Sequence, residues 1–237
     1  NVYDQNHKYE LKDGNGFIVE YNFDDKFKYE GEYKNGKRNG KGKEFNDMRI
    51  KYVGEYLNGE RHGKGKEIVF YLFGEKIMFE GEFLYGKKNG KIKEFMNDIL
   101  LFEGEYLNDH KLKGKEYHNG RIEYEGEYLY DKKWNGKGYD INKNTIYELK
   151  NGKGKVKTYY SNDFLEYEGE YLNGKMHGKG KLYDRGIKNK IYFDGEFLYG
   201  KRWNGKSNEY IFGGYTFEGT FLNGKRNGNG KEYYKGR

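Results

Sequence analysis

The chain has 237 residues, carries 45 Lys and Arg against 38 Asp and Glu, and contains no Cys, no Pro and no Ala. The absence of Cys excludes disulfides and thiolate metal sites, and no apolar run approaches the roughly 20 residues that span a bilayer. Aromatic residues make up 19% of the chain, which argues against disorder, and the abundance of Gly over Ala disfavours long helices, so we expect β structure.

The amino terminus shows no charged and then apolar leader sequence. Together with the absence of Cys, this predicts a cytoplasmic protein, with association to a membrane or to the cytoskeleton left open. The chain begins at Asn1 without Met, so we also expect it to be part of a larger polypeptide.

A repeat of about 23 residues runs along the whole chain. The second copy reads Tyr-Glu-Gly-Glu-Tyr-Lys-Asn-Gly-Lys-Arg-Asn-Gly-Lys-Gly-Lys-Glu-Phe from Tyr29, and the first and seventh copies have a shortened hairpin. Both shortened copies are followed by the shortest spacing, 20 residues, as a three-residue deletion predicts. The ten repeats start near residues 9, 29, 52, 79, 102, 124, 147, 167, 193 and 217.

Each repeat is predicted to form one β-hairpin. From Ile50 to Tyr56, every second residue is apolar or Gly, which is typical of a half-buried strand. Asn58-Gly59 then supplies the positive φ angles of a tight turn, and Gly63 to Lys66 returns as a second strand. Because one hairpin cannot bury its rings alone, we expect the repeats to stack.

One Gly in most repeats lies between two inward-facing aromatic residues. Without a side chain, it leaves a slot in which we expect the ring of a neighbouring repeat to lie against the backbone. These structural glycines, which we expect to tolerate no side chain, are Gly31, Gly54, Gly81, Gly104, Gly126, Gly169 and Gly195.

The repeats resemble the MORN (membrane occupation and recognition nexus) family, whose unit reads Tyr-Glu-Gly-Glu-aromatic and then Asn-Gly-Lys-x-x-Gly-x-Gly. The resemblance covers nearly the whole chain and implies an all-β fold: an elongated, single-domain array over residues 1–237, made of about ten stacked antiparallel β-hairpin repeats. One departure points to a variant repeat form, because Gly-x-Gly is followed here by Lys-Glu-aromatic where the family often alternates Tyr and Thr.

No catalytic, cofactor or metal site is predicted. The phosphate-loop pattern from Gly200 to Ser207 aligns with an ordinary hairpin, whereas the motif requires a loop that opens a helix. His62 and His177 stand at turn positions, and the other histidines have no partner at ligand spacing. We therefore expect a protein that is not an enzyme and has no cofactor.

The net charge of +7 raises the question of a polyanionic partner. Nucleic acid is disfavoured, because outward Glu30 and Glu32 are expected to pair across strands with Lys41 and Lys43, which matches most of the charge. The hairpins carry basic pairs that are predicted to be unmatched and to form a ladder along one edge. We interpret this ladder as a solvated edge that prevents aggregation or as a surface for anionic lipid or an acidic partner, and its residues are Lys37, Arg38, Lys87, Lys88, Lys132, Lys133, Lys201, Arg202, Lys225 and Arg226.

Two irregularities are candidate partner contacts. Trp134 and Trp203, the only tryptophans, are interpreted as single insertions whose bulges tip a ring out of the array. The apolar run that contains Phe70 and Leu72 lies in the longest spacing between repeats. Packing against an adjacent repeat is the alternative for both.

The leading functional hypothesis is a non-catalytic scaffold for protein interaction or spacing, with a protein partner of unknown identity. Two alternatives stay open: a peripheral tether that binds anionic lipid through the basic hairpin edge, and an accessory module of a larger enzyme.

Overall fold

The computed structural model describes residues 10–21, 26–46, 49–71, 74–160, 162–211 and 215–234. The elements of these residues are all β-strands, β1 to β20, and each hairpin is antiparallel. The predicted all-β array of hairpins is therefore confirmed. The chain divides into two compact modules, which we call the N-terminal module (Asn1–Gly120) and the C-terminal module (Arg121–Arg237).

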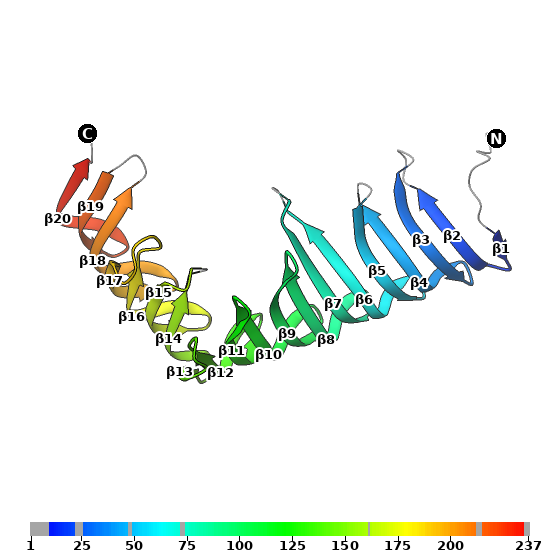
Figure 1. Ribbon diagram of the computed structural model, residues 1–237, viewed down its shortest axis with the longest axis horizontal. Coiled ribbons are helices and arrows are strands. Elements are labelled where there is room, and N and C mark those ends of the chain that lie inside the picture. The colour runs from blue at the N-terminus through cyan, green and yellow to red at the C-terminus, as the bar shows by residue number, and fades with distance from the viewer. Residues whose placement is uncertain are drawn as a thin grey trace. The chain divides into compact units, whose positions relative to one another are not determined.

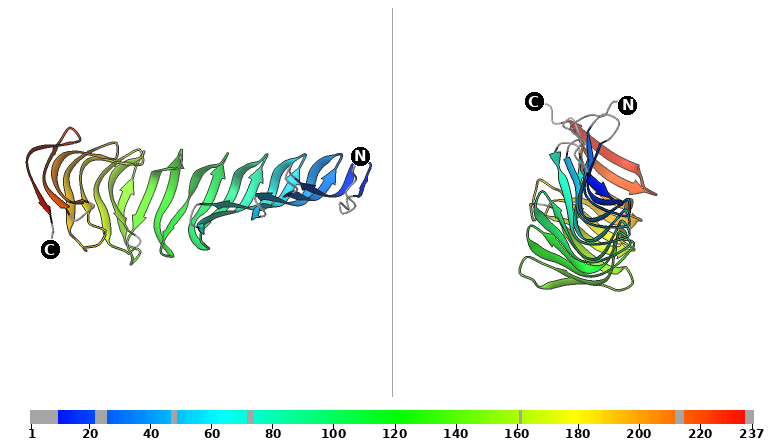
Figure 2. Two further views of the ribbon diagram at one scale, coloured as in Figure 1. Left: turned by 90° about the horizontal axis from the view of Figure 1, so that it is seen from above. Right: turned by 90° about the vertical axis from the view of Figure 1, so that its right-hand side faces the viewer.

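In the N-terminal module, ten strands lie side by side in the order of the chain, each antiparallel to the next (Figures 1 and 2). The first repeat starts at Tyr9, which lies outside the described residues. The strands are β1 (Glu10–Lys12), β2 (Asn15–Tyr21), β3 (Phe27–Lys34), β4 (Lys37–Asn46), β5 (Arg49–Leu57), β6 (Glu60–Phe70), β7 (Lys76–Leu84), β8 (Lys87–Met96), β9 (Ile99–Leu107) and β10 (His110–His118).

The C-terminal module follows the same plan with one break. The shortened repeat supplies β13 and β14, which are joined only by the bridge between Lys150 and Lys153, so the ladder is interrupted there. The strands are β11 (Arg121–Leu129), β12 (Lys132–Tyr139), β13 (Thr145–Leu149), β14 (Lys153–Tyr159), β15 (Leu165–Leu172), β16 (Lys175–Tyr183), β17 (Ile191–Leu198), β18 (Lys201–Ile211), β19 (Tyr215–Leu222) and β20 (Lys225–Tyr234).

The core of each module is a ladder of aromatic rings on one face of the sheet, which we call the inner face. Tyr56 packs edge to face against Tyr52 of its own repeat, at 5.5 Å between ring centroids, and against Tyr29 of the preceding repeat, at 5.2 Å. In the C-terminal module, Phe197 joins Phe193 and Tyr167 in the same way. Edge-to-face contacts of this kind stabilise consecutive repeats against one another.

Most structural glycines lie under the ring of their own repeat, not under that of a neighbouring repeat as we expected; Gly81 and Gly195 instead lie against the backbone of the paired strand. Gly31 pairs with Gly42 across the hairpin, and the ring of Tyr29 lies against both. The two glycines together make a flat platform for one ring. A Cβ would lie less than 3.0 Å from its nearest heavy atom at every one of the predicted positions, which are Gly31, Gly54, Gly81, Gly104, Gly126, Gly169 and Gly195.

Candidate functional site

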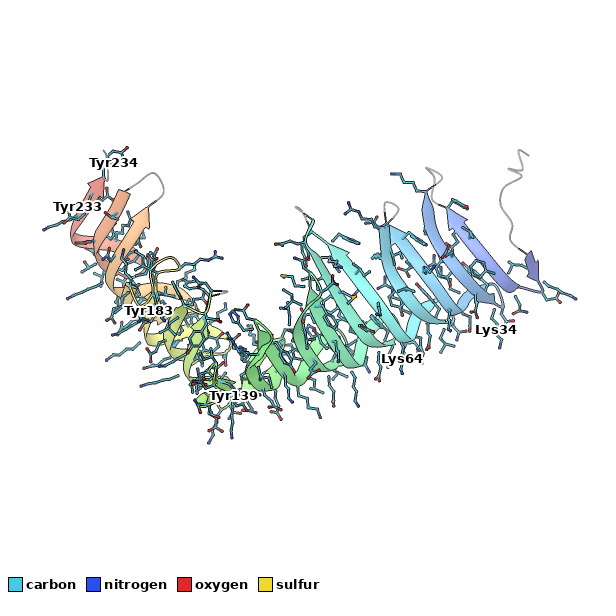
Figure 3. The ribbon with its side chains drawn as sticks, in the orientation of Figure 1. Lys34, Lys64, Tyr139, Tyr183, Tyr233 and Tyr234 are labelled. Carbon is cyan, nitrogen blue, oxygen red and sulfur yellow. The ribbon has the colours of Figure 1, made fainter. Side chains whose placement is uncertain are left out.

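Successive hairpin turns are joined along one edge of each module by backbone hydrogen bonds. The amide of Gly59 donates to the carbonyl of Arg38 at 2.8 Å, and that of Gly86 donates to Arg61 at 2.9 Å. In the C-terminal module, Gly224 N donates in the same way to Trp203 O at 2.9 Å. The ladder that we inferred from the sequence required the turns to share an edge, and within each module they do. We call this row of turns the hairpin edge; Lys34 and Lys64, two exposed lysines of the strands that end there, are labelled in Figure 3.

Three hairpins carry Tyr where the others carry Asn at the first turn position. Asn35 and Asn58 adopt φ of 51° and 52°, as the tight turn requires, and Tyr85, Tyr130 and Tyr199 adopt φ of 48° to 50°. These tyrosines are 64%, 75% and 61% exposed. These tyrosines were not among the predicted contacts, although the sequence carries a signal for them: Leu-Tyr-Gly-Lys or Leu-Tyr-Asp-Lys replaces Leu-Asn-Gly-Lys.

The two members of each basic pair face opposite sides of the sheet. The first member follows the turn directly and is exposed on the outer face. Side chains alternate along a strand, so the second member falls on the inner face, among the rings. The exposed members are Lys37, Lys87, Lys132, Lys201 and Lys225, and the inward members are Arg38, Lys88, Lys133, Arg202 and Arg226.

Each inward cation lies over an aromatic ring and close to a carboxylate; the ring is the leading one of the same repeat, except that Arg202 lies nearer to Phe221 of the next repeat. The guanidinium of Arg38 lies 4.0 Å from the centroid of Tyr29, and its Nη2 lies 2.8 Å from Glu20 Oε2. Lys88 Nζ lies 4.4 Å from the centroid of Phe79 and 3.2 Å from Glu67 Oε2. These five residues are therefore matched within the fold, which corrects our expectation that Arg38, Lys88, Lys133, Arg202 and Arg226 are unmatched charges on the edge.

Some of these carboxylates, Glu44 and Glu232 among them, come from the Lys-Glu-aromatic segment in which this repeat departs from the usual family pattern. Glu44 accepts hydrogen bonds from the hydroxyl of Tyr56 at 3.0 Å and from Arg61 Nη2 at 2.7 Å. Arg61 Nη1 also lies 2.6 Å from Glu67 Oε1, which in turn contacts Lys88 of the next repeat. On the inner face of the N-terminal module, a row of alternating charges from Glu20 to Lys88 thus links one repeat to the next.

The charges of this row shift the pKa values of its members. Burial raises the pKa of Glu44, but the hydrogen bond and charge of Arg61 outweigh it and hold the pKa below its ordinary value. Burial, and then the negative charge of Glu44, raise the pKa of Tyr56 well above the usual range of a phenol. Glu44 is therefore ionised and Tyr56 is neutral, which are the states that their hydrogen bond requires.

The repeat that starts at Tyr167 lacks both halves of this arrangement. Met176 stands where the other full-length repeats have the inward cation. Leu182 stands opposite Tyr167, where five of those repeats have Glu and the repeats at Tyr124 and Phe193 have Gly138 and Ser207. In this repeat, apolar side chains therefore take both places.

The outer face pairs several of its charges across strands. Lys43 Nζ lies 2.7 Å from Glu30 Oε1, and Lys66 Nζ lies 3.1 Å from Glu80 Oε1. The expected pairing is therefore confirmed for Glu30 and Lys43, whereas Glu32 and Lys41 form no ion pair in the described part of the chain. Pairs of this kind contribute little stability, about 0 to 1 kcal/mol each, but they reduce the net charge of the strands.

The two tryptophans are not insertions. Gly126 pairs with Gly136 and Gly195 with Gly205, whereas Gly31 pairs with Gly42, so the hairpins that contain Trp are one residue shorter than ordinary hairpins. Trp134 and Trp203 stand where other repeats have Asn, His or Leu, and each is partly buried against the turn Gly of the next repeat, Gly152 or Gly224. Packing against the adjacent repeat, the alternative that we left open, accounts for both rings.

Phe70, one of the two remaining candidate contacts, lies at the opposite end of its strand from the hairpin turn. The extra residues near Phe70 lengthen β6, where Phe70 pairs with Lys76 and is 41% exposed. Its ring lies 5.2 Å from the guanidinium carbon of Arg49. Leu72 lies outside the described residues.

The residues that the structure describes contain no arrangement of side chains typical of a catalytic site. Gly200 to Ser207 spans a turn and part of β18, not the start of a helix. The described ranges contain no group of three or more His, Asp or Glu residues that could hold a metal ion. They also include no helix with the length and hydropathy needed to cross a bilayer.

The fold defines a class of protein: an all-β array of hairpin repeats whose successive turns are joined by hydrogen bonds. Five of the predicted repeats match the family model of the MORN repeat, at residues 29–47, 52–68, 79–91, 167–186 and 217–236. The chain is a MORN repeat protein. The repeats near 102, 124 and 193, outside the matched segments, form hairpins with the same pairing of two glycines. No curated protein matches the chain.

The family sets the broad functional class. MORN repeats are non-catalytic modules that generally mediate interaction with proteins or membranes, and they are often associated with membranes.

Proposed function

We propose that this protein is a non-catalytic scaffold that binds and spaces protein partners through its hairpin edge. The observation that carries the proposal is the division of each basic pair. One member stabilises the core, while the other is presented at a turn that hydrogen bonds hold in register with its neighbours. An edge of this kind offers equivalent side chains at a fixed spacing, which suits the recognition of extended partners.

The same division weakens the membrane tether as an alternative. A polybasic surface gains about 1 kcal/mol per basic side chain held near anionic lipid. Half of the residues that we assigned to this surface are bound to carboxylates on the inner face, so the attraction would be about half of what the sequence suggests. An accessory role beside an enzyme on the same polypeptide would use the same edge for attachment.

Flotation with phosphatidylserine vesicles at low and high salt separates the scaffold from the tether. We expect the wild-type protein to stay in the soluble fraction at both salt concentrations. The hairpin variant replaces Lys37, Lys87, Lys132, Lys201 and Lys225 with Ser, and the matched control makes the same change at five exposed lysines of the strands, Lys41, Lys64, Lys91, Lys155 and Lys179. Salt-sensitive flotation that only the hairpin variant loses would overturn the scaffold in favour of the tether.

The scaffold also predicts a contact at the turns. With p-benzoylphenylalanine in place of Tyr85 or Tyr130, irradiation in the source cells should give discrete protein adducts. The same group in place of Lys179, on β16, should give none. An equal set of adducts from all three positions would show that the hairpin edge is not the contact surface.

A further inference from the structure

The hairpin edges of the two modules differ in charge. We count each turn segment as the two turn residues and one residue on either side. In the N-terminal module these segments contain four basic residues, Lys12, Lys34, Lys37 and Lys87, which are nearly balanced by three acidic ones, Asp13, Glu60 and Asp109. The corresponding segments of the C-terminal module contain six lysines and a single acidic residue, Asp131. These lysines are Lys132, Lys150, Lys153, Lys175, Lys201 and Lys225.

All six lysines of the C-terminal edge are exposed. Within the described part of the chain, none of them lies at ion-pair distance from a carboxylate, in contrast to Lys43, Lys157 and Lys181 of the outer face. Exposed cations that follow one another along an edge without carboxylates create a local positive potential, and this potential attracts anionic groups.

Apolar groups stand between these cations. Tyr130 and Tyr199 are exposed, as are Leu129 and Leu222 beside the turns. Both tyrosines have positive φ, which is unusual for a bulky residue, and Tyr199 also contacts the ring of His177 at 5.0 Å between centroids. Tyrosines that stay this exposed and are flanked by lysines are suited to contact a partner.

The spacing of the edge fits an extended polypeptide. Consecutive hairpins advance by about 9 to 10 Å, since each contributes two strands at roughly 4.8 Å. Three residues of a strand span about 10 Å, and one turn of polyproline II, also three residues, spans about 9.3 Å. A carboxylate at every third residue of an extended segment would therefore meet successive lysines in register.

Twist disfavours a flat surface as the occupant. Adjacent strands are rotated by roughly 20 to 25° with a constant hand. Figure 1 shows the strands of this module turning progressively from β11 to β20. The turns therefore follow a curved line, which a flexible chain can track and a planar bilayer can touch only over part of its length.

We propose that the hairpin edge of the C-terminal module binds an extended acidic protein segment that carries a carboxylate near every third residue. The lysines pair with the carboxylates, and Tyr130 and Tyr199 cover the apolar groups between them. This inference rests on the proposed scaffold function and assigns its partner chemistry to one module.

Fluorescence anisotropy with a labelled peptide tests the inference. The probe has about 15 residues, with Glu at every third position and Ser elsewhere, and the control peptide has the same composition with its Glu residues contiguous. We expect the full chain to bind the spaced peptide several-fold more tightly than the contiguous one. We also expect affinity to fall between about 50 mM and about 300 mM salt as screening increases.

Matched variants locate the site. Replacing Lys132, Lys175, Lys201 and Lys225 with Ser should weaken binding about tenfold or more, whereas the same change at Lys12, Lys34, Lys37 and Lys87 should leave affinity within about twofold. Changing Tyr130 and Tyr199 together to Asn should weaken binding without lowering the melting temperature, because Asn is the residue that other turns use. Tyr85→Asn in the N-terminal module is the control for this change.

Three results would overturn the inference: no binding at low salt, equal loss in both lysine variants, or equal affinity for the two peptides. Flotation on phosphatidylserine vesicles that only the C-terminal lysine variant loses, without peptide binding, would assign this edge to lipid. If the peptide fails while the crosslinks at the turns persist, the scaffold stands and only the acidic partner is wrong.

Discussion

Replacing Gly104 with Val is expected to destabilise the protein by roughly 3 kcal/mol, at the upper end of overpacking, or to prevent folding of its module. A Cβ on Gly104 would lie 2.6 Å from the Cα of Gly114 and 2.7 Å from Cζ of Phe102. One neighbour is backbone in a paired strand and the other is a fully buried ring, so neither can give way. Urea unfolding followed by far-ultraviolet circular dichroism measures the change.

Gly186 provides the control for this substitution. It is exposed, and a Cβ there would contact only Asp184 Oδ1, at 3.5 Å. Gly186→Val should change the free energy of unfolding by no more than about 0.5 kcal/mol. Equal effects of the two substitutions would show that the platform of paired glycines has been assigned wrongly.

The charge row predicts energetic coupling between Arg61 and Glu67. Arg61→Met and Glu67→Leu are each expected to cost about 2 kcal/mol, because each leaves a partly buried charge with fewer partners. The double variant reproduces the Met and Leu of the repeat at Tyr167, and its cost should fall short of the sum by about 1 kcal/mol or more. In this double variant, Glu44 still contacts Arg38 and Tyr56, and Lys88 still contacts Asp109, so the remaining charges have partners.

An exposed pair supplies the control for the double-mutant cycle. Lys43 and Glu30 are as close as Arg61 and Glu67 but lie on the outer face, so Lys43→Met and Glu30→Leu should show a coupling below about 0.5 kcal/mol. If the inner pair proves as additive as the outer one, the row of alternating charges does not link the repeats.

The repeat pattern predicts most of the fold because its signals are local. Asn-Gly, which recurs in five of the ten repeats, specifies the turns, and alternation from Ile50 to Tyr56 specifies the strand and its buried face. The break between β13 and β14 follows the shortened repeat near Tyr147. The division into two modules has no counterpart in the repeat pattern, which continues across residue 120 without a linker.

The basic pairs show where sequence interpretation failed and why. Lys37 and Arg38 look equivalent as a charged dipeptide, but consecutive residues of a strand face opposite sides. Extending the alternation beyond the turn would have placed Arg38 beside Tyr29 and Glu44, and so would have identified the ion pairs. The tryptophans were misplaced for a different reason: strand pairing, not local similarity, shows that Trp203 replaces Asn and that a later residue is missing.

Selective acetylation of lysines in the native protein, read by mass spectrometry, tests the division of the basic pairs most directly. Lys87 and Lys88 are adjacent in sequence, as are Lys132 and Lys133, so each pair contains its own control. We predict rapid modification of Lys87 and Lys132 and slow modification of Lys88 and Lys133, whose side chains are only 15% and 17% exposed and lie over rings. The difference should vanish in denaturant; equal rates within the pairs of the native protein would contradict the account.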